Sequence, residues 1–195
     1  MKHSRFPLIP VLGICLVTLS LLWLGVSQFR LYKGANTSQQ ILSQIENILP
    51  EYTHGTPEFY SDPAMPVLSL DGTDYVAVLD IPAFGITLPV QDQWQSNRLS
   101  LTPARFSGSA YDSTLVIGGA DHSRQFGFCD EIENGAFVTV TDMTGAQFNY
   151  TVAKVDRAKH AEIEWLVDKN YHLTLFYRDA FSTEYLAVRC VFAYS

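Results

Sequence analysis

The most informative part of the sequence is the stretch Leu173-Thr-Leu-Phe-Tyr-Arg-Asp-Ala-Phe-Ser-Thr-Glu-Tyr-Leu-Ala-Val-Arg-Cys190. Residues Leu173 to Phe176 and Leu186 to Val188 are rich in apolar and aromatic side chains, which predicts two strands. The polar segment from Asp179 to Glu184 predicts the turn that joins them. Two adjacent strands that end at a loop form a rigid platform, and functional side chains are commonly placed on such loops. The stretch is therefore the first place to look for an active or binding site.

Upstream of this pair, the sequence indicates a domain built mostly of short strands. The predicted strands are 75–81, 85–90, 114–118, 136–141 and 148–155. The tetrapeptide Asp142-Met-Thr-Gly145 is a candidate hairpin turn between the last two of these. Short helical pieces are expected near Gln95 to Ser100, Phe126 to Ile132 and Glu162 to Val167. Many short, closely spaced strands with few helices predict a closed or nearly closed β-barrel.

The N-terminal part of the chain has the composition of a membrane anchor. The run from Phe6 to Phe29 carries no charged residue, and at about 1.5 Å per residue it is long enough to cross a bilayer as a helix. A cleaved signal peptide is the alternative, but no Ala-x-Ala-like cleavage site follows. Basic residues flank the run on both sides, and His3 and the terminal amine favour a cytoplasmic N-terminus. We expect a single-pass membrane protein with its C-terminal domain outside the cell.

A short helix and a linker are expected to connect the anchor to the barrel. Gly34 opens a junction, Thr37 and Gln40 resemble a capping box, and the amphipathic helix that follows ends at Pro50. Residues Glu51 to Pro66 have the Pro, Gly and Ser content of a linker. The predicted domains are an anchor over 1–33, a helix and linker over 34–66, and the barrel over 67–195.

Composition excludes several classes of function. The formal net charge is −7 and the sequence contains no cluster of Lys or Arg, which argues against a nucleic-acid partner. Cys15, Cys129 and Cys190 have neither the spacing of a metal site nor the number expected of a disulfide scaffold. The histidines lack the pairing of a metal centre, and nucleotide-binding glycine motifs are absent from the sequence. We predict no metal and no cofactor.

The strand pair resembles the last two strands of sortases, the cysteine transpeptidases of Gram-positive bacterial surfaces. In that family the first strand ends in a motif like Leu-Thr-Leu-x-Thr-Cys, where Cys is the nucleophile, and the second opens with a catalytic Arg. Leu173-Thr-Leu175 and Val188-Arg-Cys190 match this pattern. The resemblance places Arg178 at the nucleophile position and Tyr185 at the position of the catalytic Arg.

Further segments resemble sortases in the expected order. They are 79–82, 85–90, 103–109, 115–119, Phe126, 131–135 and 138–140. The family's catalytic His follows directly on Val-Ile-x-Gly, which here places Ala120 at that position, with His122 two residues further on. The resemblance implies a mostly β fold: a sortase-like closed β-barrel with short helices, preceded by a transmembrane helix and a short amphipathic helix.

The three substitutions imply a pseudosortase, because the residues at these positions supply neither a thiol nor an imidazole. We expect it to bind sorting-signal-like peptides of surface proteins or to assist an active sortase, with four candidate groove residues: Arg178, Tyr185, His122 and Arg189. Arg189 shares a strand face with Tyr185, which also suits a structural role. The alternatives are an active cysteine transpeptidase with relocated catalytic residues and a structural or sensing ectodomain.

Neither cysteine of the barrel is expected to take part in catalysis at the groove. Cys190 lies five residues after Tyr185, and in a strand an odd offset places it on the opposite face. Cys129 follows Phe126-Gly-Phe at a position where the family carries an apolar residue, which suits a small buried side chain.

Overall fold

A computed structural model describes residues 8–50, 52–55, 60–159, 162–179, 182 and 184–193. Two α-helices are present in this part of the chain, α1 (Leu8–Glu46) and α2 (Ile163–Leu166), together with a short 3-10 helix, η2 (Pro82–Phe84). The strands are β1 (Thr53–His54), β2 (Leu68–Leu70), β3 (Thr73–Ile81), β4 (Ile86–Gln91), β5 (Ala104–Ser107), β6 (Leu115–Gly118), β7 (Phe137–Asp142), β8 (Ala146–Ala158), β9 (Leu173–Arg178) and β10 (Tyr185–Phe192).

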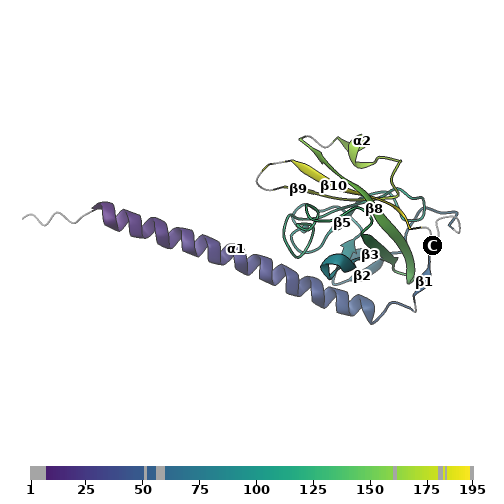
Figure 1. Cartoon of the computed structure of the whole chain (residues 1–195). Helices are drawn as coiled ribbons and strands as arrows, with labels where there is room; N and C mark the ends of the chain where they lie inside the picture. Colours follow the sequence, from purple (N-terminus) through teal and green to yellow (C-terminus); the bar gives the residue numbers. More distant parts are fainter. Residues whose placement is uncertain are drawn as a thin grey trace, which may run out of the picture.

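The strands close into a barrel. Hydrogen-bonded neighbours follow the order β8, β10, β9, β6, β5, β4 and β3, and β7 pairs with both β3 and β8 to complete the ring. The small strands β1 and β2 extend the sheet outside this ring, on β8 and β3. The predicted closed β-barrel is therefore confirmed, and Figure 1 shows it lying beside the C-terminal end of α1.

Successive side chains along each strand point alternately into the barrel and to its outer face. In β9, Leu173, Leu175 and Tyr177 belong to the main core, whereas Phe176 belongs to a second cluster on the outside. In β10 the same division places Leu186, Val188 and Cys190 inward and Ala187 outward. The outer face of β6, β9 and β10 is the surface on which the candidate positions lie.

The hairpin predicted between β7 and β8 is confirmed. Asp142 ends β7, and Gly145 adopts φ 84° immediately before β8, a left-handed conformation that glycine enters at little cost. The fully buried Asp142 carboxylate accepts hydrogen bonds from the Thr144 N–H (2.8 Å), the Ala146 N–H (3.0 Å) and the Tyr111 hydroxyl (2.5 Å). These bonds fix the turn and join it to the loop before β6.

Some elements differ from the sequence prediction. The short helix predicted near Glu162 to Val167 is present as α2, but residues 95–100 and 126–132 form turns. Strand β5 was not predicted, because its Ala-Arg-Phe-Ser sequence has little apolar alternation. Within the stretch expected to be a linker, β1 pairs with β8 in parallel, and Met65 is buried in the barrel core.

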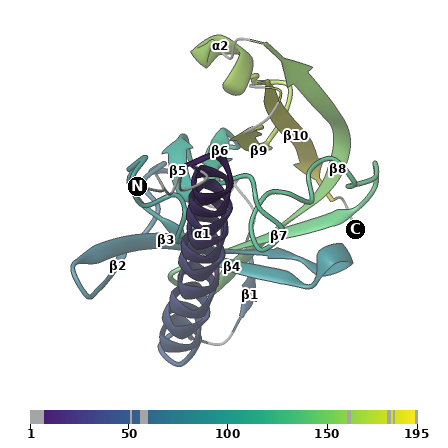
Figure 2. The same cartoon turned by 90° about the vertical axis from the view of Figure 1, so that its left-hand side faces the viewer.

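The N-terminal helix is continuous, which corrects the expected junction at Gly34 and the capping box at Thr37. Helix α1 runs from Leu8 to Glu46, and Leu42 and Ile45 pack it against Tyr75 and Val78 of β3. Its N-terminal part projects away from the barrel (Figure 1). Figure 2 shows α1 foreshortened, lying in front of the barrel strands and outside the barrel.

Within the described part of the chain, no helix is both long enough and apolar enough to cross a membrane. The transmembrane anchor predicted over Phe6 to Phe29 is therefore not confirmed.

Candidate functional site

The barrel brings together the three positions that the sequence singled out. Arg178, the last residue of β9, pairs directly with Tyr185, the first residue of β10. Gly118 of β6 pairs with Phe176, and the Gly119 N–H donates to the Phe176 carbonyl (3.0 Å). Ala120 follows at the same end of the sheet, beside the end of β9. The ends of three neighbouring strands thus form one candidate site.

An aromatic cluster covers the outer face next to these positions. Phe176 stacks with Trp94 (ring centroids 5.5 Å apart, interplanar angle 16°) and meets Phe106 edge-on (5.3 Å). Trp94 also lies over Gly118, where an added Cβ would come 2.2 Å from the indole ring. Only glycine leaves room for this contact. The cluster makes the surface beside Arg178 apolar.

Ala120 is held in place by a buried amide that the sequence did not single out. Gln125 is 1% exposed, and its Oε1 accepts a hydrogen bond from the Ala120 N–H (2.8 Å) while its Nε2 donates to the Leu99 carbonyl (2.8 Å). Gln125 therefore ties the loop after β6 to the loop between β4 and β5. Nothing in the sequence pattern singled out Gln125, because its two contacts join loops that are apart in the chain.

His122 lies in the same loop and is half-buried. Burial lowers the pKa of its imidazole, and a hydrogen bond to the Ser100 backbone opposes that shift. Its Nε2 atom is buried and has no hydrogen-bond partner among the described residues. The ring is thus mostly neutral at pH 7 and packs toward the β4–β5 loop.

Arg178 and Tyr185 also approach one another through their side chains. The guanidinium carbon of Arg178 lies 5.8 Å from the centre of the Tyr185 ring, a separation at which a cation and an aromatic face attract. Arg178 is exposed and Tyr185 is half-buried. Together they place a permanent cation and a phenol at the edge of the aromatic cluster.

The two cysteines of the barrel lie away from this surface. Cys129 and Cys190 are both free, fully buried and part of the barrel core, which confirms both sequence predictions. Burial raises the pKa of both thiols. Because the thiolate is the nucleophilic form, both cysteines are poorly suited to catalysis.

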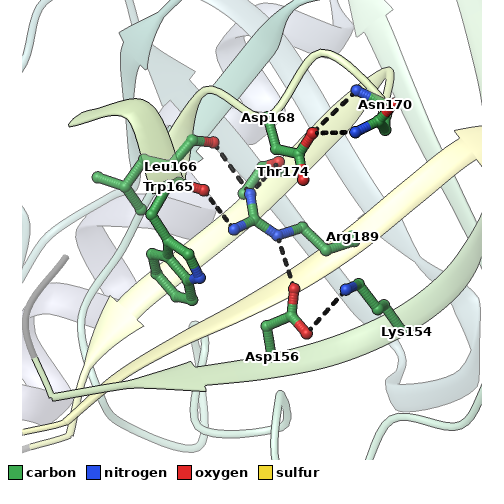
Figure 3. Close-up of polar contacts among 8 residues, drawn as sticks. All are labelled: Lys154, Asp156, Trp165, Leu166, Asp168, Asn170, Thr174 and Arg189. Atoms are coloured by element: carbon green, nitrogen blue, oxygen red, sulfur yellow. Dashed lines mark hydrogen bonds and ion pairs between the residues drawn. The ribbon is translucent and has the colours of Figure 1, made fainter. Parts of the chain in front are cut away.

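Arg189 is fully buried, unlike Arg178. Its guanidinium contacts Asp156, Thr174 and the carbonyls of Trp165 and Leu166 (Figure 3). These contacts favour the structural role over direct contact with a peptide. Within the described residues, no group of three or more His, Cys, Asp or Glu side chains is placed to hold a metal ion.

The geometry defines a closed β-barrel whose candidate site lies on the outer face, at the ends of three adjacent strands. No protein-family profile matches the sequence, and no curated protein matches it. Solved structures do match. Sortase C1 of Streptococcus agalactiae superposes with a TM-score of 0.57 at 24% identity, covering 66% of this chain and 72% of that chain.

Other structures with this architecture come from different bacteria. Sortase A of Corynebacterium diphtheriae gives a TM-score of 0.55 at 14% identity and covers 85% of each chain. A sortase D5 transpeptidase of Clostridium perfringens gives 0.51 at 14% identity, covering 62% of this chain and 79% of that chain. The protein therefore has a sortase-like fold.

Proposed function

We propose that this protein is a pseudosortase: a sortase-like barrel that binds peptides resembling sorting signals, or assists an active sortase, without catalysing transpeptidation. The observation that carries the proposal is the identity of the three side chains at the ends of β6, β9 and β10. Ala120, Arg178 and Tyr185 provide neither a sulfur nor an imidazole where the sortase resemblance requires both.

The missing groups are essential to the reaction. A sortase-like transpeptidation needs a thiolate to attack a peptide carbonyl, an acid to protonate the leaving amine and a donor to stabilise the oxyanion. Arg178 cannot attack, because its guanidinium remains protonated. Ala120 cannot exchange a proton, and Tyr185 retains only the ability to donate a hydrogen bond. Loss of the nucleophile alone costs about 10⁶ in turnover in a triad hydrolase.

Relocated catalysis receives little support from the surrounding residues. Cys129 and Cys190 lie in the barrel core with raised pKa values. The half-buried His122 is hydrogen-bonded to the Ser100 backbone. An accessible thiol next to an imidazole, the arrangement that a displaced Cys–His pair needs, is not formed by these three residues.

The remaining chemistry suits recognition. Arg178 offers a cation with several donors for a peptide carboxylate or carbonyl. Trp94, which is 37% exposed, and the half-buried Phe106 pack on the buried Phe176 and offer an apolar surface for a side chain of the same peptide. A short peptide that carries an apolar residue next to an acidic group or a free carboxylate fits this pairing.

Turnover and binding can be tested with the full chain in detergent micelles and a quenched sorting-signal peptide. With an amine nucleophile present, we expect no cleavage. Titration of the labelled peptide should show binding that weakens about tenfold in Arg178→Ala, the loss expected for one charge-assisted hydrogen bond. Arg98→Ala is the matched control, because the Arg98 guanidinium donates to the hydroxyl of Thr73 at the start of β3 and not to a residue of the candidate site. Binding that is insensitive to Arg178→Ala removes the role of that cation, and no binding at all favours a structural or sensing ectodomain.

Attachment to the cell membrane, with the barrel outside the cell, is the second part of the proposal. The attachment itself is supported by the apolar side chains of α1 from Leu12 to Val26, which are exposed, with Trp23 at 74% and Leu22 at 69%. Such a surface is stabilised by transfer into lipid. Full-length protein should float with liposomes in a density gradient, and Leu19→Glu with Leu22→Glu should abolish flotation. Flotation unchanged by both substitutions contradicts this attachment.

A further inference from the structure

Arg189 is an unusual side chain, because it points out of the barrel and is nevertheless 0% exposed. Its neighbours Val188 and Cys190 belong to the core, so Arg189 lies on the same outer face as Ala187 and Tyr185. The segment 162–172 between β8 and β9, which contains α2, covers it. Burying a cation is costly unless its donors are satisfied. The segment 162–172 supplies two of the required acceptors, the carbonyls of Trp165 and Leu166, and these bonds hold the segment over Arg189.

The guanidinium joins this segment to two strands of the barrel. Nη1 donates to the Leu166 carbonyl (3.0 Å) and to Thr174 Oγ1 of β9 (3.1 Å), and Nη2 donates to the Trp165 carbonyl. Nε donates to Asp156 Oδ2 of β8 (3.3 Å). Figure 3 shows the guanidinium at the centre of these partners. A single side chain thus fixes a loop and two strands relative to one another.

The contacts to Trp165 and Leu166 satisfy the end of a helix. Helix α2 has four residues and ends at Leu166, and the last carbonyls of a helix have no partners within it. A helix this short is not stable by itself in water. Arg189 supplies the missing donors, and its guanidinium also lies 4.7 Å from the Trp165 ring centre and 5.8 Å from that of Tyr171.

Anchoring of α2 builds one side of the candidate site. Leu166 packs with Val116, Phe176 and Ala187 on the outer face, and Trp165 and Tyr185 pack against the same cluster. Phe176 precedes Arg178 by two residues and also stacks with Trp94. A shift of α2 would therefore move Phe176, and with it the aromatic surface next to Arg178.

We propose that Arg189 is a positioning residue, which fixes α2 and residues 162–172 as a wall of the peptide site without touching the peptide. The peptide-binding part of this inference rests on the proposed function. The anchoring part does not, because it concerns contacts within the chain alone.

Two substitutions separate the charge from the hydrogen-bond geometry of Arg189. Arg189→Met keeps the apolar stem and removes every donor. We expect amide hydrogen exchange in 162–172 to accelerate at least about tenfold, since the two charge-assisted bonds to the Trp165 and Leu166 carbonyls are lost. Arg189→Lys keeps the charge but not the fork-shaped donor set, and should rescue protection only in part. Exchange in 162–172 that is unchanged in Arg189→Met overturns the anchoring.

A matched control distinguishes positioning from general destabilisation. Val138→Ala lies in β7, in the barrel core and outside the α2 cluster, and it should lower overall stability without selectively increasing exchange in 162–172. If the ordered wall is populated only about a tenth of the time in Arg189→Met, the apparent Kd for the labelled peptide rises about tenfold. Val138→Ala should leave that Kd unchanged.

The outcomes identify which claim fails. Faster exchange in Arg189→Met with an unchanged peptide Kd overturns the role of α2 as a wall of the site. Equal weakening of binding by Val138→Ala and Arg189→Met also overturns it. If the unmodified protein does not bind the peptide, the proposed function fails together with the wall, and the exchange measurement still decides the anchoring.

Discussion

At the scale of single residues, the candidate site is defined by the three residues at the ends of neighbouring strands. Ala120, Arg178 and Tyr185 lie at the ends of β6, β9 and β10 because the register of these strands is fixed by their inward-facing side chains. A strand that slipped by one residue would turn its apolar side chains outward. The relative positions of the three residues therefore depend on the core, and substitutions among them should leave the barrel folded.

Restoring the family residues tests whether this geometry still supports catalysis. We expect Ala120→His, Arg178→Cys and Tyr185→Arg together to give slow but measurable cleavage of a quenched sorting-signal peptide, because all three required groups are then present. The double variant without Arg178→Cys should stay inactive. Continued inactivity of the folded triple variant would mean that the surrounding groove no longer places a peptide in register.

His122 should make stability depend on pH. Burial lowers its pKa below the ordinary value of 6.5, so the unfolded chain binds a proton more readily than the folded chain just below pH 6.5. The free energy of unfolding should therefore fall as the pH decreases from 6.5 toward the folded-state pKa. Urea unfolding at several pH values should show a weaker dependence in His122→Gln.

His172 should contribute independently to the same measurement, since burial lowers its pKa as well. His172→Gln should remove a separate part of the pH dependence, and the double variant should remove more than either single variant. A pH dependence that is the same in His122→Gln and the unmodified protein would contradict the link to His122.

Sequence reasoning at this scale succeeded where strand alternation decides the outcome. The odd offset of Cys190 from Tyr185 correctly placed it on the opposite face, and the apolar residue that sortases carry at the position of Cys129 correctly predicted its burial. It missed Trp94 and Gln125, because their roles depend on contacts between loops far apart in the chain. The burial of Arg189 was missed for the same reason, since its cover comes from 162–172.

At the scale of elements, the docking of α1 on the barrel depends on a few apolar side chains. Ile45 is fully buried with Leu42 against β3, whereas Ile48, in the turn just after α1, is 56% exposed. Ile45→Ala should lower the free energy of unfolding by about 2–4 kcal/mol, because it removes a buried side chain and leaves a cavity. Denaturant unfolding of the full chain in micelles measures this loss.

Ile48→Ala provides the matched control, with an expected change within about 0.5 kcal/mol. If both substitutions changed the free energy of unfolding equally, the packing of Ile45 on β3 would not contribute to the stability of the barrel.

The elements that sequence analysis predicted well are those with strong periodicity. Strands β3, β4, β7, β8, β9 and β10 have apolar residues on the side facing the core, which gives a clear signal. Strand β5 gave almost none. Helix α1 was split at Gly34 because glycine and Thr37 are local stop and start signals, yet helix propensity is weak compared with packing on β3.

At the scale of the whole molecule, the order of weak motifs predicted the architecture better than any single motif did. Each segment alone was short, but the order of the segments along the chain predicted the closed ring of strands. The same architecture is found in the solved sortase structures. The fold does not determine whether the barrel is catalytic, because the same scaffold can carry different functions. That question depends on the side chains at the strand ends.

The most direct test of the central claim is intact-mass spectrometry of the full chain after incubation with a sorting-signal peptide, with and without an amine nucleophile. We predict no acyl adduct on the protein and no transpeptidation product. An acyl adduct, or a product whose formation is abolished by Cys129→Ala or Cys190→Ala, would contradict the pseudosortase assignment.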